Sequence, residues 1–284
     1  MAIATPLKNG SFDEEKFREL VEWHIEQGTH GIVPCGTTGE SPTLKPSEHV
    51  DVIRVCVEQV KKRVPILAGT GSNSTLEAIK MTQRAKELGA DGTLQVTPYY
   101  NKPTQEGLIA HYRQIVKEAP LPLVVYNVPG RTAISVTVET MKRLAEIPEV
   151  VGMKEATGNM GFDAELLAAL PDDFSLLSGD DGTSFPFMAL GGKGVISVTA
   201  NVVPKRMSQF VQAALDGKWE ESRKIFYELL PLHEAMFFEA NPIPVKAALA
   251  LMGKMAPEIR SPLTPLSEKF MAPLKKALTD AGVI

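Results

Sequence analysis

The chain has few of the residues that mark several large classes of protein. It has two cysteines among 284 residues, Cys35 and Cys56, and no long apolar run. A disulfide scaffold and a membrane span are therefore not indicated. The net charge is −4. The densest basic run, Lys61–Arg63, is interpreted as the solvent-exposed end of a helix. We expect no nucleic-acid partner and no membrane partner.

No targeting pattern is visible where the chain opens, at Met-Ala-Ile-Ala-Thr-Pro. We therefore expect a cytoplasmic protein whose two cysteines are reduced and packed.

Metal-ligand spacing is also missing. None of the five histidines pairs with another at such a spacing, and no Cys-x-x-Cys occurs. The pair Asp180-Asp181 is interpreted as a cap for the following helix. The sequence therefore predicts no metal site and no bound cofactor.

Eight short apolar runs are present, and longer amphipathic stretches separate them. Such near-continuous apolar runs are typical of parallel strands covered by helices. Eight strand–helix units within roughly 210 residues favour a TIM (β/α)8 barrel over an open doubly wound sheet, because no glycine-rich phosphate fingerprint follows the first strand. The predicted strands are Ala2–Thr5, Gly31–Cys35, Pro65–Ala68, Gly92–Val96, Pro122–Tyr126, Val150–Lys154, Phe174–Ser178 and Gly194–Val198.

Helix ends can be read between these runs. Ser11 before Glu14, and Ser74 before Glu77, have capping-box spacing. Pro46 suits a first helical turn, and Gly28 and Gly89 suit helix ends. Beyond residue 217 strands are no longer expected, so we predict a catalytic barrel at 1–217 and a helical domain at 218–284. Its predicted helices are Trp219–Glu239, Pro242–Met252 and Ser267–Ala281.

Barrel enzymes carry their chemistry at the carboxyl ends of the strands, where Lys154 ends an apolar run. Strand alternation should point this lysine toward the barrel axis. Loss of hydration there disfavours the charged ammonium, and the neutral amine is the form that attacks a ketone. The alternative is a lysine paired with a carboxylate such as Glu155.

The ends of other predicted strands carry hydroxyl side chains and one arginine that could act together with Lys154. Tyr126 ends the strand next to that of Lys154, where a phenol can carry protons to and from an imine. Thr37 is positioned to extend a hydroxyl chain from Tyr126. Thr38 lies with it in Gly36–Gly39, where backbone N–H groups can converge on a carboxylate. Arg131 can grip a carboxylate with two parallel hydrogen bonds.

Six motifs, in order and spacing, together resemble the dihydrodipicolinate synthase family essentially from end to end. The resemblance also includes NPIPVK at Asn241–Lys246, and it implies a (β/α)8 barrel with a three-helix C-terminal domain. The motifs are GTTGE at Gly36–Glu40, TPYYN at Thr97–Asn101, YNVPGRT at Tyr126–Thr132, GMKEATG at Gly152–Gly158, LLSGDD at Leu176–Asp181 and GVISVTAN at Gly194–Asn201.

The resemblance implies a role for each matching residue. Lys154 matches the Schiff-base lysine, and Tyr126 matches the proton donor and acceptor. Thr37 matches the middle of a proton relay. Tyr100 matches a tyrosine that reaches into the partner subunit's site. The positions that match substrate ligands are Thr38, Gly179 and Ile196 for pyruvate and Arg131 for the carboxylate of the semialdehyde.

The implied reaction condenses pyruvate with L-aspartate 4-semialdehyde to 4-hydroxy-tetrahydrodipicolinate, in lysine and diaminopimelate biosynthesis. The implied assembly is a homotetramer of two tight dimers.

Feedback by L-lysine at the dimer interface is a further property that the resemblance implies. Pro42 and Pro46 depart from the pattern of lysine-sensitive bacterial members, so sensitivity stays open. The matching positions are Ser41, Pro42, His49, Gly71, Asn73, Glu77 and Tyr99.

Two alternatives remain. One is a related pyruvate-dependent aldolase or dehydratase acting on a keto-deoxy sugar acid, which uses the same lysine machinery. Arg131 favours the synthase over it, because a guanidinium suits the carboxylate of a short semialdehyde. The other is a barrel that binds a keto acid without catalysis. The set of Lys154, Tyr126 and Thr37 argues against this second alternative.

Overall fold

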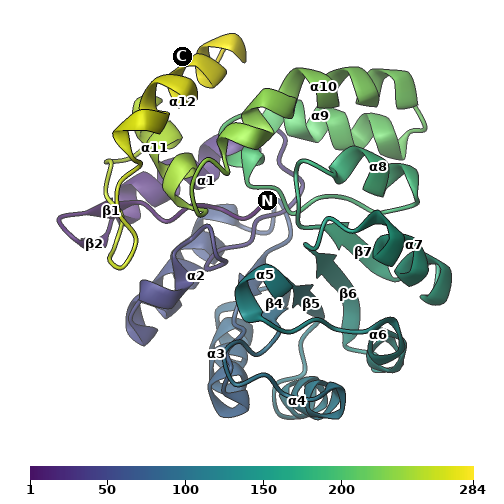
Figure 1. Ribbon diagram of the computed structural model, residues 1–284. Helices are drawn as coiled ribbons and strands as arrows, with labels where there is room; N and C mark the ends of the chain where they lie inside the picture. Colours follow the sequence, from purple (N-terminus) through teal and green to yellow (C-terminus); the bar gives the residue numbers. More distant parts are fainter. The chain divides into compact units, whose positions relative to one another are not determined.

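The computed structural model describes all residues from Met1 to Ile284 (Figure 1). The chain divides into two compact units. A continuous unit runs from Ile66 to Ile196, and a segmented unit joins Met1–Pro65 to Ser197–Ile284. The predicted domain boundary after residue 217 falls inside the segmented unit and stays a prediction. None of the helices has both the length and the apolar character needed to cross a membrane.

A five-stranded parallel sheet forms the centre of the continuous unit, with its strands in chain order. Parallel neighbours need crossover connections, and each of the four connections here contains at least one helix. Figure 1 shows α3, α4, α6 and α7 along the outer side of strands β4 to β7. The strands are β3 (Leu67–Gly69), β4 (Gly92–Val96), β5 (Leu123–Asn127), β6 (Val150–Glu155) and β7 (Ser175–Ser178), and the helices are α3 (Thr75–Leu88), α4 (Gln105–Glu118), α5 (Pro129–Thr132), α6 (Val138–Ala145), α7 (Met160–Ala169) and α8 (Ser184–Ala189).

The core of this unit lies between the sheet and those helices. Val125 of β5 and Met153 of β6 belong to one buried apolar cluster with Tyr112 of α4 and Leu166 of α7. Successive side chains on a strand point to opposite faces. The neighbours of Val125 and Met153 therefore point away from the helices, which fixes the orientation of Tyr126 and Lys154.

The other three predicted strands are reduced to isolated bridges, Ala2 with Val33 and Ser178 with Val195. The backbone bonds are present, since Ile3 N–H donates to Val33 O at 3.2 Å and Val33 N–H to Met1 O at 2.8 Å. Cys35, at φ 57°, leaves the extended conformation, which ends the second run after a few residues.

A short hairpin that we did not predict precedes the first helix. Strands β1 (Leu7–Lys8) and β2 (Ser11–Phe12) flank Asn9 and Gly10, which both have positive φ. An Asn-Gly pair is the preferred sequence for such a turn. The predicted Ser11 cap is therefore wrong. Asp13 caps the helix instead, and its carboxylate accepts from Lys16 N–H at 3.1 Å.

The other predicted helix ends are confirmed. Pro46 begins α2, Ser74 caps α3, and Gly28 and Gly89 take left-handed conformations just after their helices. Lys61–Arg63 follow the end of α2. The helices of the segmented unit are α1 (Glu14–Glu26), η1 (Ser41–Thr43), α2 (Pro46–Val60), η2 (Thr199–Asn201), α9 (Pro204–Leu215), α10 (Trp219–Ala235), α11 (Ile243–Leu251) and α12 (Glu268–Asp280).

The three predicted C-terminal helices match α10, α11 and α12. Helix α10 ends at Ala235, before the predicted Glu239. The remaining residues form a bend, in which the Glu239 carboxylate accepts from the N–H of Ser267 at 3.2 Å.

Gly152→Ala tests the tight contact between β6 and β7. A Cβ at this position would lie 2.6 Å from the carbonyl oxygen of Ser175, so the two strands would have to separate. We expect a loss of unfolding free energy of about 1–3 kcal/mol, measured by chemical denaturation. Gly130→Ala is the control, because no atom lies within 4 Å of its added Cβ. Equal stability of the two variants would contradict the contact.

Candidate active site

Tyr126 and Lys154 lie side by side at the ends of β5 and β6. They are register partners in the parallel ladder, and the lysine Nζ is 4.3 Å from the centroid of the tyrosine ring. Both side chains are nearly buried, with exposed fractions of 7% for Tyr126 and 5% for Lys154. Both also lie on the face of the sheet opposite the helices. An amine and a phenol are thus in contact at the carboxyl end of the sheet.

The Glu155 side chain forms its hydrogen bonds on the helix-covered face of the sheet. It accepts from Asn127 Nδ2 at 3.2 Å and from the N–H of Thr157, which is 2.9 Å from each carboxylate oxygen. Asn127 is held in turn by Val136 N–H, which donates to its Oδ1 at 3.0 Å. The alternative in which Glu155 pairs with Lys154 is therefore wrong, because alternation along β6 sends the two side chains to opposite faces.

Gly179 provides space for the lysine side chain. A Cβ at residue 179 would lie 2.7 Å from both Lys154 Cε and Ala156 Cβ. Ile196 is near the same strand end, since its N–H donates to Ser178 O at 2.8 Å and its side chain is buried. These two predicted site residues therefore border the end of β7, and Gly179 is packed against the lysine itself.

Tyr100 and Arg131 lie in the loops after β4 and β5. Tyr100 is 89% exposed and has φ 73°, a left-handed conformation that is rare for an aromatic residue. Arg131 is an exposed residue of the short helix α5. Both side chains are thus on the surface, at the carboxyl end of the sheet.

Thr37 and Thr38 belong to the segmented unit, in a tight turn. Gly39 N–H and Glu40 N–H donate to Gly36 O and Thr37 O, each at 3.1 Å. Thr38 is buried, and its Oγ1 accepts from Asn241 Nδ2 at 3.0 Å. The predicted relay from Thr37 to Tyr126 stays a prediction.

A buried ion pair holds the same turn. Glu40 and Lys246 form a salt bridge with both side chains buried, and Lys246 Nζ also donates to Thr5 O at 3.0 Å. The second oxygen of Glu40 accepts from Arg260 N–H at 2.9 Å. Burial lowers the pKa of Lys246, and the charge of Glu40 opposes that shift. No role was predicted for Glu40 or Lys246, although a lone lysine in the apolar helix α11 was a visible signal.

The predicted effector positions fall in both units. In the continuous unit, Asn73 Nδ2 donates to Tyr99 O at 3.2 Å, and Glu77 accepts from Ser72 Oγ at 2.8 Å. Gly71 is closely packed, since an added Cβ would lie 2.4 Å from Val96 N. The segmented unit holds Ser41 and Pro42 in η1 and the buried His49 in α2.

The remaining polar candidates are the aspartate pair before α8, two buried histidines and the two cysteines. Asp180 accepts from the N–H of Thr183 at 3.0 Å. Thr183 is itself the residue that precedes α8, and no side chain caps this helix, so the predicted cap role of Asp180-Asp181 is wrong. Neither ring nitrogen of His24 has a hydrogen-bond partner. Burial lowers the pKa of His24 to about 3 and that of His111 to about 4. Burial also raises the pKa values of Cys35 and Cys56.

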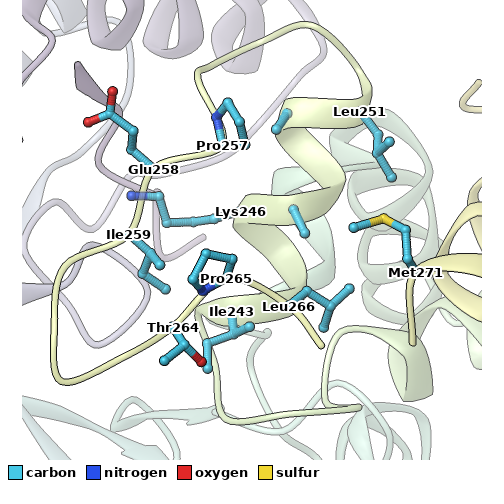
Figure 2. Close-up of a pocket in the computed structure, with 12 residues that line it drawn as sticks. Ile243, Lys246, Leu251, Pro257, Glu258, Ile259, Thr264, Pro265, Leu266 and Met271 are labelled. Carbon is cyan, nitrogen blue, oxygen red and sulfur yellow. The ribbon is translucent and has the colours of Figure 1, made fainter. Parts of the chain in front are cut away.

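A separate cavity of about 250 Å³ lies between α11, the following loop and the start of α12. Figure 2 shows the Lys246 nitrogen pointing away from Leu266 and Met271, so only the stem of this lysine lines the cavity. None of the predicted site residues borders it.

Comparison with known proteins gives a full-length match. The pattern of the dihydrodipicolinate synthetase family matches residues 1–281. The 4-hydroxy-tetrahydrodipicolinate synthase of Nitratidesulfovibrio vulgaris strain Hildenborough is 56% identical over 284 residues, covering 100% of this chain and 97% of that protein.

Two solved structures are also similar. Dihydrodipicolinate synthase from Acinetobacter baumannii in complex with pyruvate has a TM-score of 0.98 at 51% identity, covering 100% of this chain and 98% of that one. The enzyme from Cyanidioschyzon merolae with lysine bound has a TM-score of 0.97 at 42% identity, covering 100% and 97%. These similarities confirm the predicted fold class, a (β/α)8 barrel with a helical C-terminal region.

Gly179→Ala should displace the lysine side chain, because the new Cβ would occupy the space of Lys154 Cε. We expect borohydride trapping of a small 2-oxo acid on Lys154 to slow by about 10²-fold, as a misplacement of 1 Å can cause. Gly182→Ala, in the same loop, is the control, since the atom nearest to its Cβ is 3.8 Å away. Unchanged trapping in Gly179→Ala would show that residue 179 does not set the position of the amine.

Proposed function

Because the chain belongs to the dihydrodipicolinate synthetase family, we propose that it condenses pyruvate with L-aspartate 4-semialdehyde through a Schiff base on Lys154. The product is 4-hydroxy-tetrahydrodipicolinate, a precursor for lysine and diaminopimelate. Supporting the proposal, a relative that is 56% identical has this synthase name, and a similar solved structure holds pyruvate.

One observation carries the mechanism: the contact between the buried amine of Lys154 and the ring of Tyr126, at 4.3 Å from nitrogen to centroid. The neutral form of a lysine amine is the one that attacks a ketone. Glu155, the nearest carboxylate in sequence, is bonded to Asn127 and Thr157 on the other face. Glu155 therefore does not form an ion pair with the amine.

The covalent steps follow from this amine. Lys154 attacks the ketone of pyruvate, and loss of water from the carbinolamine gives an imine. Loss of a methyl proton gives an enamine, whose carbon attacks the aldehyde. The amino group of the semialdehyde then closes onto the imine carbon and releases Lys154. The protonated imine on Lys154 accepts the electron pair that the departing methyl proton leaves, so the proposed chemistry needs neither a metal nor a cofactor.

Tyr126 is the proposed proton carrier for these steps, since a phenol close to the amine can both donate and accept a proton. Thr37 and Tyr100 extend the proposed relay, and Tyr100 does so from a partner subunit. This role for Tyr100 is supported by its 89% exposure, because an aromatic side chain so exposed in one chain has its surface available to another.

The substrate contacts are proposed residue by residue. Thr38, Gly179 and Ile196 border the pyruvate, with Thr38 and the backbone at Gly179 and Ile196 as polar contacts. Arg131 takes the carboxylate of the semialdehyde, for which its exposure at the mouth of the site leaves room.

We propose a cytoplasmic homotetramer built from two tight dimers, with a catalytic domain at 1–217 and a helical domain at 218–284. We also propose L-lysine as an effector, because one similar solved structure has lysine bound. Its site is assigned to Ser41, Pro42, His49, Gly71, Asn73, Glu77 and Tyr99. Within that set, Glu77 offers a carboxylate to an amine, and Asn73 offers an amide to a carboxylate.

Lys154→Ala tests the nucleophile. The variant should stay folded, because it removes a buried ionisable group together with its desolvation cost. We expect turnover of pyruvate and semialdehyde to fall by about 10³-fold or more, and the borohydride-stable pyruvate adduct to disappear from the peptide that contains residue 154. Lys142→Ala, an exposed lysine paired with Glu139 at 3.3 Å, is the control.

Wild-type turnover in Lys154→Ala would refute the nucleophile. Turnover of the wild type with pyruvate and sugar aldehydes, but not with the semialdehyde, would replace the synthase by a sugar-acid aldolase. An absence of any adduct would indicate a keto-acid-binding barrel.

Tyr100→Phe tests the proton relay. Loss of one hydroxyl should slow overall turnover by about 10²-fold, at the low end of the range for a positioned acid–base group. The pyruvate adduct should still form on Lys154, because the proposed role of Tyr100 lies in later proton transfers. Tyr227→Phe, another exposed tyrosine, is the control. Loss of the adduct in Tyr100→Phe would place this tyrosine at imine formation instead.

A further inference from the structure

Two buried carboxyl groups, Glu155 and Asp163, lie on the helix-covered side of β6, the strand that carries Lys154. Glu155 ends β6 and is 2% exposed, and Asp163 of α7 is 0% exposed. On α7 the aspartate shares the buried face with Leu166, one turn further along. An acidic residue on an apolar helix face is rarely buried without a partner.

The hydrogen bonds of the two groups are unequal. Glu155 accepts from Asn127 and from Thr157, as described above. Neither carboxylate oxygen of Asp163 receives a hydrogen from any donor group. The charge of Glu155 and a hydrogen bond with its carboxyl group both raise the pKa of Asp163, which requires the two side chains to be neighbours. Two ionised carboxylates in contact repel each other, whereas one shared proton makes the contact a hydrogen bond.

Other charged groups near Asp163 do not supply a counter-charge. Asp180, in the loop after β7, is another acid, and its carboxylate accepts from the N–H and Oγ1 of Thr183. Helix α8 contains no titratable residue. On α6 the basic residues are Lys142 and Arg143, which are exposed and pair with Glu139 and Glu106.

Burial, with the charges of Glu155 and Asp180, raises the pKa of Asp163 to about 7. The raised pKa agrees with the lack of hydrogen-bond donors around the Asp163 carboxylate. Both observations favour one proton on the Asp163–Glu155 pair near neutral pH.

We propose that Asp163 is a positioning residue: its carboxyl group is protonated and donates a hydrogen bond to the Glu155 carboxylate. The donated hydrogen bond fixes the Glu155 carboxylate against Asn127 and Thr157. Asn127 directly follows Tyr126, and Glu155 directly follows Lys154, so the shared proton ties together the two strand ends that present the amine and the phenol. The pair then holds one negative charge rather than two. Its role in catalysis rests on the function proposed above.

Infrared spectroscopy of the substrate-free protein tests the shared proton. The wild type should show a protonated-carboxyl band at pH 6 that disappears with a midpoint near pH 7. The band should be missing in Asp163→Asn and retained in the control Glu165→Gln, which removes an exposed carboxylate two residues further along α7. A wild type without the band, or an Asp163→Asn variant that keeps it, would overturn the proposal.

Thermal melting against pH provides a second measurement. The unfolded aspartate releases its proton near its ordinary pKa of 3.8, whereas the folded one keeps it to about 7. The folded state therefore binds more protons between these values, and wild-type stability should fall as pH rises through this range and level off above it. The Tm of Asp163→Asn minus the Tm of the wild type should therefore increase from pH 4 to pH 7. A pH-independent difference would count against the raised pKa of Asp163.

Trapping of pyruvate distinguishes positioning from a structural role. Asp163→Asn keeps a donor to Glu155 and should trap pyruvate on Lys154 at close to the wild-type rate. Asp163→Leu removes the donor and should slow trapping at least about tenfold while the protein stays folded. Equal rates in both variants would overturn the positioning role. The infrared and melting measurements need no substrate. They therefore test the shared proton even if the wild type traps no pyruvate and the proposed reaction is wrong.

Discussion

The alternation of side chains along β6 is the constraint on which the candidate site depends. Lys154 and Glu155 are consecutive, carry opposite charges when ionised, and would form an ion pair if the chain let them meet. The extended backbone sends them to opposite faces, so the carboxylate contacts Asn127 and Thr157 and the amine contacts Tyr126. One residue of register slip would exchange the two faces. The buried Met153, which points the same way as Glu155, specifies the register, because a slip would take it out of the apolar cluster.

A second constraint acts on the turn at Gly36–Glu40. The buried Glu40–Lys246 pair and the bond from Asn241 to Thr38 fix this turn from a segment about 200 residues away in sequence. Breaking a buried ion pair by removing one partner typically costs about 3–5 kcal/mol. The motif NPIPVK, found through the family resemblance, thus has a physical role in holding the glycine-rich turn that supplies Thr37 and Thr38.

The sequence predicted the elements with strong local patterns. Strand Gly92–Val96 was placed to the residue, and Lys154 and Tyr126 were found because polar residues at the ends of apolar strands are conspicuous. The failures depended on partners that local patterns do not contain. Ser11 and Asp13 both suit a helix cap, and the hairpin at Asn9-Gly10 placed Ser11 in a strand. Asp163 was missed because its partner Glu155 becomes its neighbour only when α7 packs on the sheet. The runs near Ala2 and Val33 were recognised, but their bridging is shorter than their apolar composition suggests.

The division of the chain has a consequence for how the protein is made. A ribosome releases residues 66–196 as one uninterrupted stretch, so the unit that contains Lys154 is complete once residue 196 has emerged. The other unit has its first 65 residues early and must wait for residues 197–284. Until Lys246 emerges, Glu40 has no buried cation, and the turn that it anchors is exposed to solvent and chaperones. The nascent chain therefore acquires the unit that contains Lys154 first, and the anchored turn that carries Thr37 and Thr38 only after Lys246 has emerged.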